Sequence, residues 1–68
     1  MSWFAVDKNG NEQEFKYEEP IFIKEDDEIA FWIPKSYKEV VKNLPKGTIE
    51  KLTGKKLTYK DKPLEYKN

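Results

Sequence analysis

The sequence predicts a small α+β domain, in which an antiparallel sheet of three to five strands packs against one or two short helices. Short runs of aromatic and β-branched residues alternate with turn signals, as is typical of antiparallel strands. An Asn-Gly pair between the first two runs indicates an N-terminal hairpin. The length of 68 residues allows one domain, residues 1–68, with a small core.

The first element is the hairpin. Residues 3–6, Trp-Phe-Ala-Val, have the composition of a strand, and residues 12–17 alternate polar with apolar side chains. Asn9 and Gly10 lie between them. This pair predicts a two-residue type I′ turn, because both central positions of that turn require a positive φ.

Two more strands are expected over residues 21–23 and 29–33, with the acidic residues 25–28 as the turn between them. In the second of these strands the odd-numbered side chains share one face and Trp32 lies on the other. If the odd-numbered side chains face the core, Trp32 faces outward or into a second layer. The sequence therefore leaves open whether Trp3 and Trp32 belong to the core or to the surface.

Residues 36–43 fit two structures. Ser36 and Glu39 have the spacing of a capping box, which favours a helix over residues 37–43. Val40 and Val41, together with the lack of an apolar stripe, favour a strand instead. The capping box tips the prediction towards the helix, and the strand stays open as the alternative.

A short helix is expected to follow. Thr48 can provide its N-cap, and Gly54 suits the left-handed position just past its end. Ile49 and Leu52 lie three residues apart on one face, and we expect both to pack inward together with Leu57.

The rest of the chain predicts a strand over residues 57–59, a turn over 61–63 and an edge strand over 64–66. The sequence contains no internal repeat, linker or low-complexity tract. We therefore expect all the predicted strands and helices to form a single domain.

The composition excludes several kinds of active site. The chain has no histidine and no cysteine, so a Ser-His or Cys-His catalytic pair, a thiolate zinc site and a disulfide are all ruled out. Carboxylate pairs remain, but a chain this short has little room for the concave pocket that they need. We therefore expect a protein that is not an enzyme, with no catalytic residues and no cofactor.

Two motifs that suggest ligand binding fail on their spacing. Six residues separate Gly47 from Gly54, and Lys56 stands where a phosphate-binding P-loop requires Ser or Thr. The acidic run at residues 25–28 lacks the alternating ligands and the central glycine of a calcium-binding loop. We expect a helix start and stop in the first case, a solvated turn in the second, and no metal site.

The net charge of zero conceals an asymmetry. Residues 1–34 contain nine acidic residues and three lysines, whereas residues 35–68 contain ten lysines and four acidic residues. Arginine is absent, so the chain lacks the planar fork that proteins use for bidentate recognition of phosphates and bases. A coding preference for lysine would explain this composition as well as a binding function does.

Two surfaces are candidates for binding. Aromatic side chains dominate protein interfaces, and a partner-binding surface would combine them with the acidic turn: Trp3, Trp32, Tyr37, Glu25, Asp26, Asp27 and Glu28. Single-stranded nucleic acids bind to aromatic rings surrounded by basic side chains, and the lysine-rich half offers such a face: Lys51, Lys55, Lys56, Tyr59, Lys60 and Lys62. The zero net charge, the missing arginine and the acidic first half speak against the second surface.

Two segments resemble a group of very small, functionally uncharacterised proteins encoded by phages and prophages. These segments are WFAVDKNG at residues 3–10 and LPKGTIEKLTGKKLTYKDKP at residues 44–63. Thr53 departs from the aliphatic residue of the pattern and Tyr59 from its frequent tryptophan, and the middle of the chain is not matched. The resemblance implies an origin and assigns no chemistry to any residue.

Small phage accessory proteins often bind host machinery, including defence systems. The expected function is therefore that of a protein-protein inhibitor or modulator of a host factor, such as a defence nuclease or effector, acting by steric occlusion. The alternatives are a nucleic-acid-binding protein and an oligomer that sequesters nucleotides. Because the start of the chain does not resemble a signal peptide and no apolar run could span a bilayer, we expect the cytoplasm of the bacterial host and no membrane contact.

Overall fold

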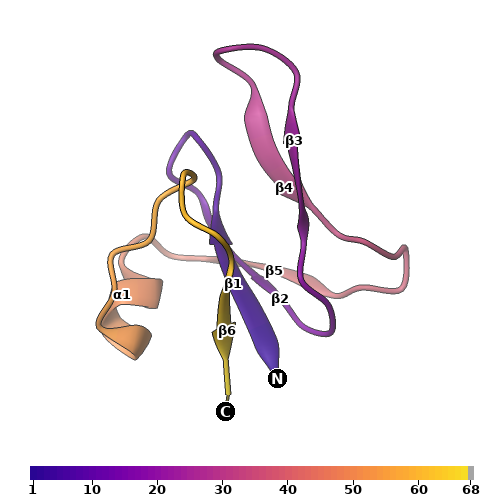
Figure 1. Ribbon diagram of the computed structural model, residues 1–68. Helices are drawn as coiled ribbons and strands as arrows, with labels where there is room; N and C mark the ends of the chain where they lie inside the picture. Colours follow the sequence, from indigo (N-terminus) through magenta and orange to yellow (C-terminus); the bar gives the residue numbers. More distant parts are fainter. Residues whose placement is uncertain (68) are drawn as a thin grey trace.

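The computed structural model describes residues 1–67. Within them, six strands form two antiparallel sheets, and one short helix lies on one side (Figure 1). In chain order the elements are β1 (Ser2–Val6), β2 (Glu12–Phe15), β3 (Ile21–Lys24), β4 (Ala30–Ile33), β5 (Val41–Leu44), α1 (Thr48–Thr53) and β6 (Leu64–Tyr66).

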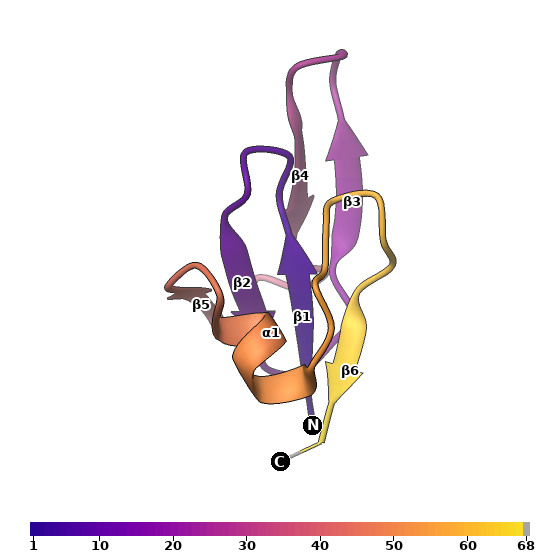
Figure 2. The same cartoon turned by 90° about the vertical axis from the view of Figure 1, so that its left-hand side faces the viewer.

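The larger sheet has the strand order β5-β2-β1-β6, and every neighbouring pair in it is antiparallel. Strands β3 and β4 form a separate two-stranded sheet. The expected strands are therefore divided between two sheets. Figure 2 shows α1 in front of the larger sheet, with the β3–β4 hairpin extending beyond the far end of β1.

The core lies between α1 and the larger sheet. Phe4 and Val6 alternate along β1 onto the same face and pack with Ile49 of α1. The partly buried side chains around this cluster are Leu44, Leu57, Leu64 and Tyr66. Ala5 and Phe15 are equally buried but lie on the opposite face of the sheet, on the side where the β3–β4 hairpin runs (Figure 1). The molecule therefore has three layers: α1, the larger sheet and the hairpin.

The loop of the N-terminal hairpin differs from the prediction. Among residues 1–67 only glycines have a positive φ, so Asn9 cannot occupy a type I′ turn. Gly10, at φ 90°, donates its N–H to the carbonyl of Asp7, and Asp7 donates its own N–H to Asn11. These bonds define a three-residue loop with a glycine bulge. The Asn9 side chain accepts the N–H of Asn11 at 3.0 Å, which satisfies a donor in the longer loop.

The prediction of a helix over residues 37–43 is wrong. Val41–Leu44 form strand β5, because the edge of β2 is free and pairs with them from Glu12↔Leu44 to Phe15↔Val41. The Glu39 carboxylate accepts the backbone N–H groups of Tyr17 and Glu18, just after β2, and does not close a capping box. The alternative of a strand, which the two valines favoured, describes this segment.

Helix α1 forms as predicted, but its N-cap is different. Gly47, at φ 93°, is the capping residue, and Thr48 instead donates its hydroxyl to the carbonyl of Pro45. The cap comes from β2, since the Glu12 carboxylate accepts the N–H groups of Gly47 and Ile49 at 2.6 and 2.8 Å. This contact ties the start of α1 to the sheet.

The end of α1 is confirmed at Gly54, which has φ 78° and donates its N–H to Glu50. Ile49 is buried as expected, and Leu57 packs against the same cluster. Leu52, in contrast, is 49% exposed, so its predicted inward packing is wrong. In a helix of six residues, only one of the two positions is turned far enough towards the sheet.

Residues 57–59 do not form the predicted strand. The Asp61 carboxylate accepts the N–H and the hydroxyl of Thr58, at 2.8 and 3.1 Å, and Asp61 donates its N–H to the Thr58 carbonyl. These bonds close a turn that replaces the strand and places Tyr59 in a loop. The edge strand over residues 64–66 is confirmed as β6, which pairs with β1.

Candidate functional site

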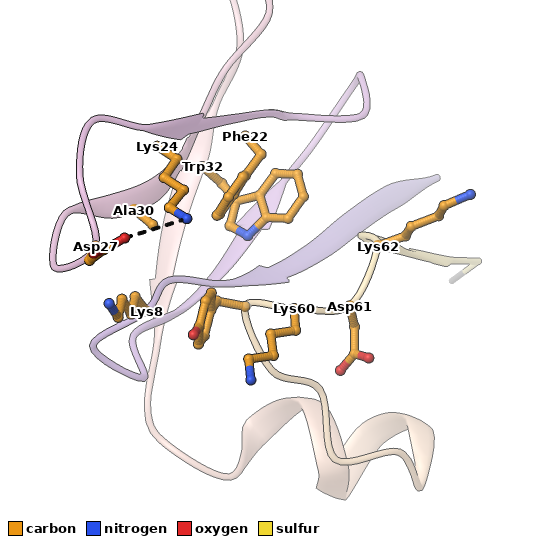
Figure 3. A pocket seen from close by; sticks show the side chains of 10 residues that line it. Lys8, Phe22, Lys24, Asp27, Ala30, Trp32, Lys60, Asp61 and Lys62 are labelled. Carbon is orange, nitrogen blue, oxygen red and sulfur yellow. Dashed lines mark ion pairs between the residues drawn. The ribbon is translucent and has the colours of Figure 1, made fainter.

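A cavity of about 560 Å³ opens between the β3–β4 hairpin and the loop that leads into β6 (Figure 3). Three aromatic rings line it, from Phe22, Trp32 and Tyr59. The remaining lining consists of four lysines, two aspartates and one alanine: Lys8, Lys24, Lys60, Lys62, Asp27, Asp61 and Ala30. We term it the aromatic cavity. Its volume lies within the range of about 300–1,000 Å³ that is usual for small-molecule sites.

The β3–β4 register places two of the rings together. Phe22 and Trp32 are directly opposite in the hairpin, so their side chains project from the same face. Their ring centroids are 4.8 Å apart with the planes inclined at 53°. Both residues are only partly buried, so some of their ring surface is open to a ligand.

Contacts from the end of β1 fix Trp32. Its indole Nε1–H donates to the carbonyl of Val6 at 3.0 Å, and its backbone N–H donates to the Asp7 carboxylate at 2.9 Å. Lys8 donates its backbone N–H to Ala30 at 3.2 Å, which brings β4 alongside β1. Because these bonds involve only protein groups, the indole is oriented before any ligand arrives.

Asp7 is an unusual carboxylate in this region. Burial raises its pKa above the ordinary value, and the N–H of Trp32 only partly offsets that effect. A partly desolvated acid therefore lies beside the aromatic cavity without lining it.

Most lysines of the cavity have no acidic partner. Within residues 1–67 a single ion pair lies within 4.0 Å, between Lys24 and Asp27 at 3.9 Å (Figure 3). The other aspartate of the cavity, Asp61, is engaged with Thr58. The lysines left without an ion pair in this part of the chain are Lys8, Lys60 and Lys62. The cavity thus combines aromatic surface with an excess of positive charge.

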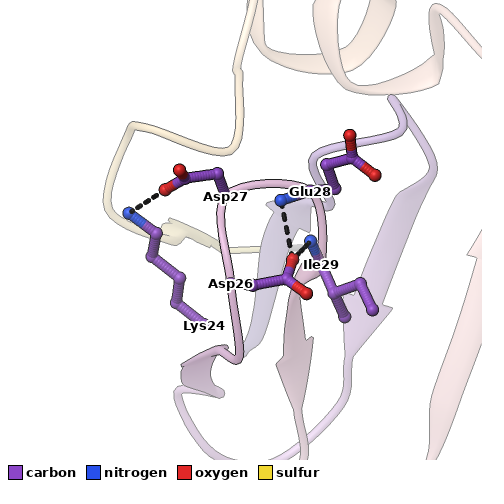
Figure 4. Close-up of polar contacts among 5 residues, drawn as sticks. All are labelled: Lys24, Asp26, Asp27, Glu28 and Ile29. Carbon is purple, nitrogen blue, oxygen red and sulfur yellow. Dashed lines mark hydrogen bonds and ion pairs between the residues drawn. The ribbon is translucent and has the colours of Figure 1, made fainter.

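The acidic turn has a structural role (Figure 4). The N–H groups of Glu28 and Ile29 both donate to one oxygen of Asp26 at 2.8 Å, and these bonds lower the pKa of Asp26. Asp26 thereby closes the turn between β3 and β4. Among the residues that the structure describes, no group of three or more carboxylates is arranged to bind a metal ion.

A second cavity, of about 470 Å³, adjoins the first, because Lys8 and Tyr59 line both. It lies between the loop after β1, the start of α1 and the segment before Tyr59. Two further lysines line it, Lys46 and Lys56. Of its three acidic lining residues, Asp7, Glu12 and Glu50, only Glu50 is exposed.

The structure brings together four of the six residues of the predicted nucleic-acid face. Tyr59, Lys60 and Lys62 line the aromatic cavity, and Lys56 lines the second cavity. The ammonium group of Lys60 lies 5.9 Å from the centroid of the Tyr59 ring. The other two lysines line neither cavity: Lys51 and Lys55.

The residues of the predicted partner-binding surface lie apart. Trp32 and Asp27 line the aromatic cavity, whereas Trp3 is partly buried within the central strand β1. Tyr37 is 93% exposed and lies in the segment after β4. The acidic turn at residues 25–28 lies before β4, at the opposite end of the hairpin (Figure 1). These residues do not form one continuous surface.

Sequence reasoning missed five residues that line the aromatic cavity: Lys8, Phe22, Lys24, Ala30 and Asp61. The pairing of the two expected strands around the acidic turn is a signal that could have placed Phe22 opposite Trp32. No comparable signal exists for Lys8, because its position depends on the contact between β1 and β4.

Comparisons with protein-family models, with curated proteins and with solved structures found no match to this chain. Within residues 1–67, no helix has the length and apolar character needed to cross a membrane.

Proposed function

We propose that the chain is a nucleotide-binding module that does not transform its ligand. A base would stack on the ring of Trp32 and its aromatic neighbours, and the phosphate would lie among the lysines at the rim. The observation that carries this proposal is the joint presence of three aromatic rings and four lysines around one cavity of about 560 Å³.

The chemistry of the lining supports this ligand class. Aromatic side chains stack on any base, and each stacked base is worth about 1–3 kcal/mol. Lysine attracts phosphate as a point charge and lacks the fork with which arginine reads base edges. A site built from lysines and rings would therefore bind nucleotides with little preference for the base.

The sequence suggested two alternatives to the function of a protein-binding inhibitor, namely nucleic-acid binding and nucleotide sequestration. The present proposal develops these alternatives. The candidate surface for a protein partner combined Trp3, Tyr37 and the acidic turn, and these lie at separate places. Nucleotide binding requires rings and lysines together, which is the arrangement around the aromatic cavity. A phage accessory protein in the cytoplasm of a bacterium would encounter both free nucleotides and nucleic acid.

Calorimetric titration with thymidine monophosphate at low salt tests the proposal. We expect Trp32→Leu to weaken binding by about 5- to 150-fold, the equivalent of one stacked base, while Trp3→Leu leaves it unchanged because Trp3 lies outside the cavity. Equal losses in both variants, or no binding by the wild-type protein, would contradict it.

A pair of lysine variants makes the test independent of folding. Lys60→Gln with Lys62→Gln removes two charges from the aromatic cavity, whereas Lys51→Gln with Lys55→Gln removes two that line neither cavity. Only the first pair is expected to weaken binding, and the difference should shrink as salt is added. The same weakening in both pairs would mean that net charge, and not the cavity, attracts the ligand.

A further inference from the structure

We infer that the natural ligand is a single strand of nucleic acid, at least two nucleotides long, whose second nucleotide occupies the second cavity. This inference rests on the proposed function of the aromatic cavity. It is carried by the continuity of the two cavities and by the side chains of the second one.

The two cavities meet at Tyr59 and Lys8, which line both. Tyr59, in the loop between α1 and β6, is partly buried and forms part of the lining of both spaces. Lys8 comes from the loop after β1. A base on either side of the tyrosine and a phosphate near Lys8 would place two linked nucleotides across this boundary.

The second cavity has the same combination of apolar surface and lysine as the first. Its accessible apolar lining comes from Leu57 and Tyr59, which are partly buried, since Val6 and Ile49 are only 6% and 1% exposed. Lys46 and Lys56 are exposed at its edge and have no acidic partner within 4.0 Å in residues 1–67. With a volume of about 470 Å³ it offers a second nucleotide both apolar contact and positive charge.

Two of the three carboxylates around the second cavity are already engaged. Asp7 accepts the N–H of Trp32, and Glu12 accepts two N–H groups at the start of α1. Backbone donors thus face these two charges and offset part of their repulsion for phosphate. Glu50, which is exposed, is the remaining one.

A single strand fits these features better than a duplex. In a duplex the faces of the bases are stacked on one another and cannot reach aromatic rings inside cavities. The lining also lacks arginine, the residue that most often reads base edges in the major groove.

The test compares thymidine monophosphate with the 5′-phosphorylated thymidine dinucleotide. We expect the dinucleotide to bind at least about tenfold more tightly, because its second unit binds as part of the same molecule. Lys46→Gln with Lys56→Gln should remove most of that gain and leave the affinity for the monophosphate unchanged. Lys51→Gln with Lys55→Gln is the charge-matched control and should change neither affinity.

Three results would overturn the inference: equal affinity for the two ligands, an equal loss of both in Lys46→Gln with Lys56→Gln, or binding of a duplex as tightly as of its separated strand. In the first and third cases the monophosphate still binds at the aromatic cavity, so the proposed function stands. In the second case the proposed function stands only if Lys60→Gln with Lys62→Gln also weakens binding of the monophosphate while Lys51→Gln with Lys55→Gln does not. If the wild-type protein binds neither ligand, the proposed function itself has failed. Far-ultraviolet circular dichroism establishes that each variant is folded.

Discussion

At the scale of single residues, Asp7 and Trp32 form one of the contacts that join the two sheets. The Asp7 carboxylate accepts the backbone N–H of Trp32 across 25 positions of sequence. Burial raises the pKa of Asp7, so the charged form that dominates at neutral pH costs stability in the folded state. The hydrogen bond from Trp32 thus stabilises the folded state, whereas the partly buried negative charge of Asp7 destabilises it.

We predict that Asp7→Asn is as stable as the wild-type protein at neutral pH, or more so, since asparagine keeps an acceptor without a buried charge. Asp7→Ala should lose about 1 kcal/mol, because the N–H of Trp32 is then left without its acceptor. Any advantage of asparagine should disappear as the pH falls through the pKa of Asp7, where the acid becomes neutral. Urea unfolding measures these differences, and an asparagine variant as unstable as the alanine variant would refute this account.

Sequence reasoning reached the types of residue at the site but not their contacts. Tyr59, Lys60 and Lys62 could be named as a group because they are close neighbours in the chain. The alternation along β4 predicts that Trp32 lies on the other face from its odd-numbered neighbours. It does not predict the hydrogen bond of Trp32 to Val6, which lies 26 positions away in the sequence. No local pattern specifies a partner at that distance.

At the scale of elements, Glu39 connects the segment before β5 to the end of β2. Its carboxylate accepts the N–H groups of Tyr17, Glu18 and Val40 at 2.7–2.9 Å. Burial by itself raises the pKa of Glu39, but these backbone donors outweigh it, so the pKa lies below the ordinary value. The ionised side chain therefore stabilises this connection.

We predict that Glu39→Gln costs about 1 kcal/mol at neutral pH, a modest value because the carboxylate is near the surface. Since the folded pKa is depressed, the contribution of Glu39 is present above the ordinary pKa value of 4.5 and is lost as the pH falls through the folded pKa. Thermal unfolding between neutral and acidic pH should thus show a smaller loss of stability in Glu39→Gln than in the wild-type protein. Glu19→Gln, at an exposed position, is the control, and identical pH curves for the two variants would rule out this role.

Elements with a clear alternation or glycine signal were predicted correctly, and those decided by a competing contact, remote or local, were not. The N-terminal hairpin, the stop of α1 at Gly54 and strand β6 follow from alternation and glycine placement. Strand β5 replaces a predicted helix because β2 offers a free edge to Val41–Leu44. The turn between Thr58 and Asp61 replaces a predicted strand because a side chain competes for the backbone.

At the scale of the whole molecule, the candidate site is a product of the three-layer arrangement. The aromatic cavity combines Lys8, two strands of the hairpin and the loop before β6, which are remote in the sequence. Its lysines come from both halves of the chain: Lys8 and Lys24 belong to the acidic half, and Lys60 and Lys62 to the basic half. The charge asymmetry of the sequence is therefore a poor guide to the position of the site.

The central claim, that the aromatic cavity binds nucleotides, is tested most directly by two-dimensional ¹H–¹⁵N NMR during titration with thymidine monophosphate. The two tryptophans give separate indole N–H signals. We predict that the signal of Trp32 shifts together with the amides of Phe22, Tyr59 and Lys60, while those of Trp3 and β5 stay in place. Shifts confined to Trp3, to Tyr37 or to the acidic turn, or none at millimolar ligand, would contradict the claim.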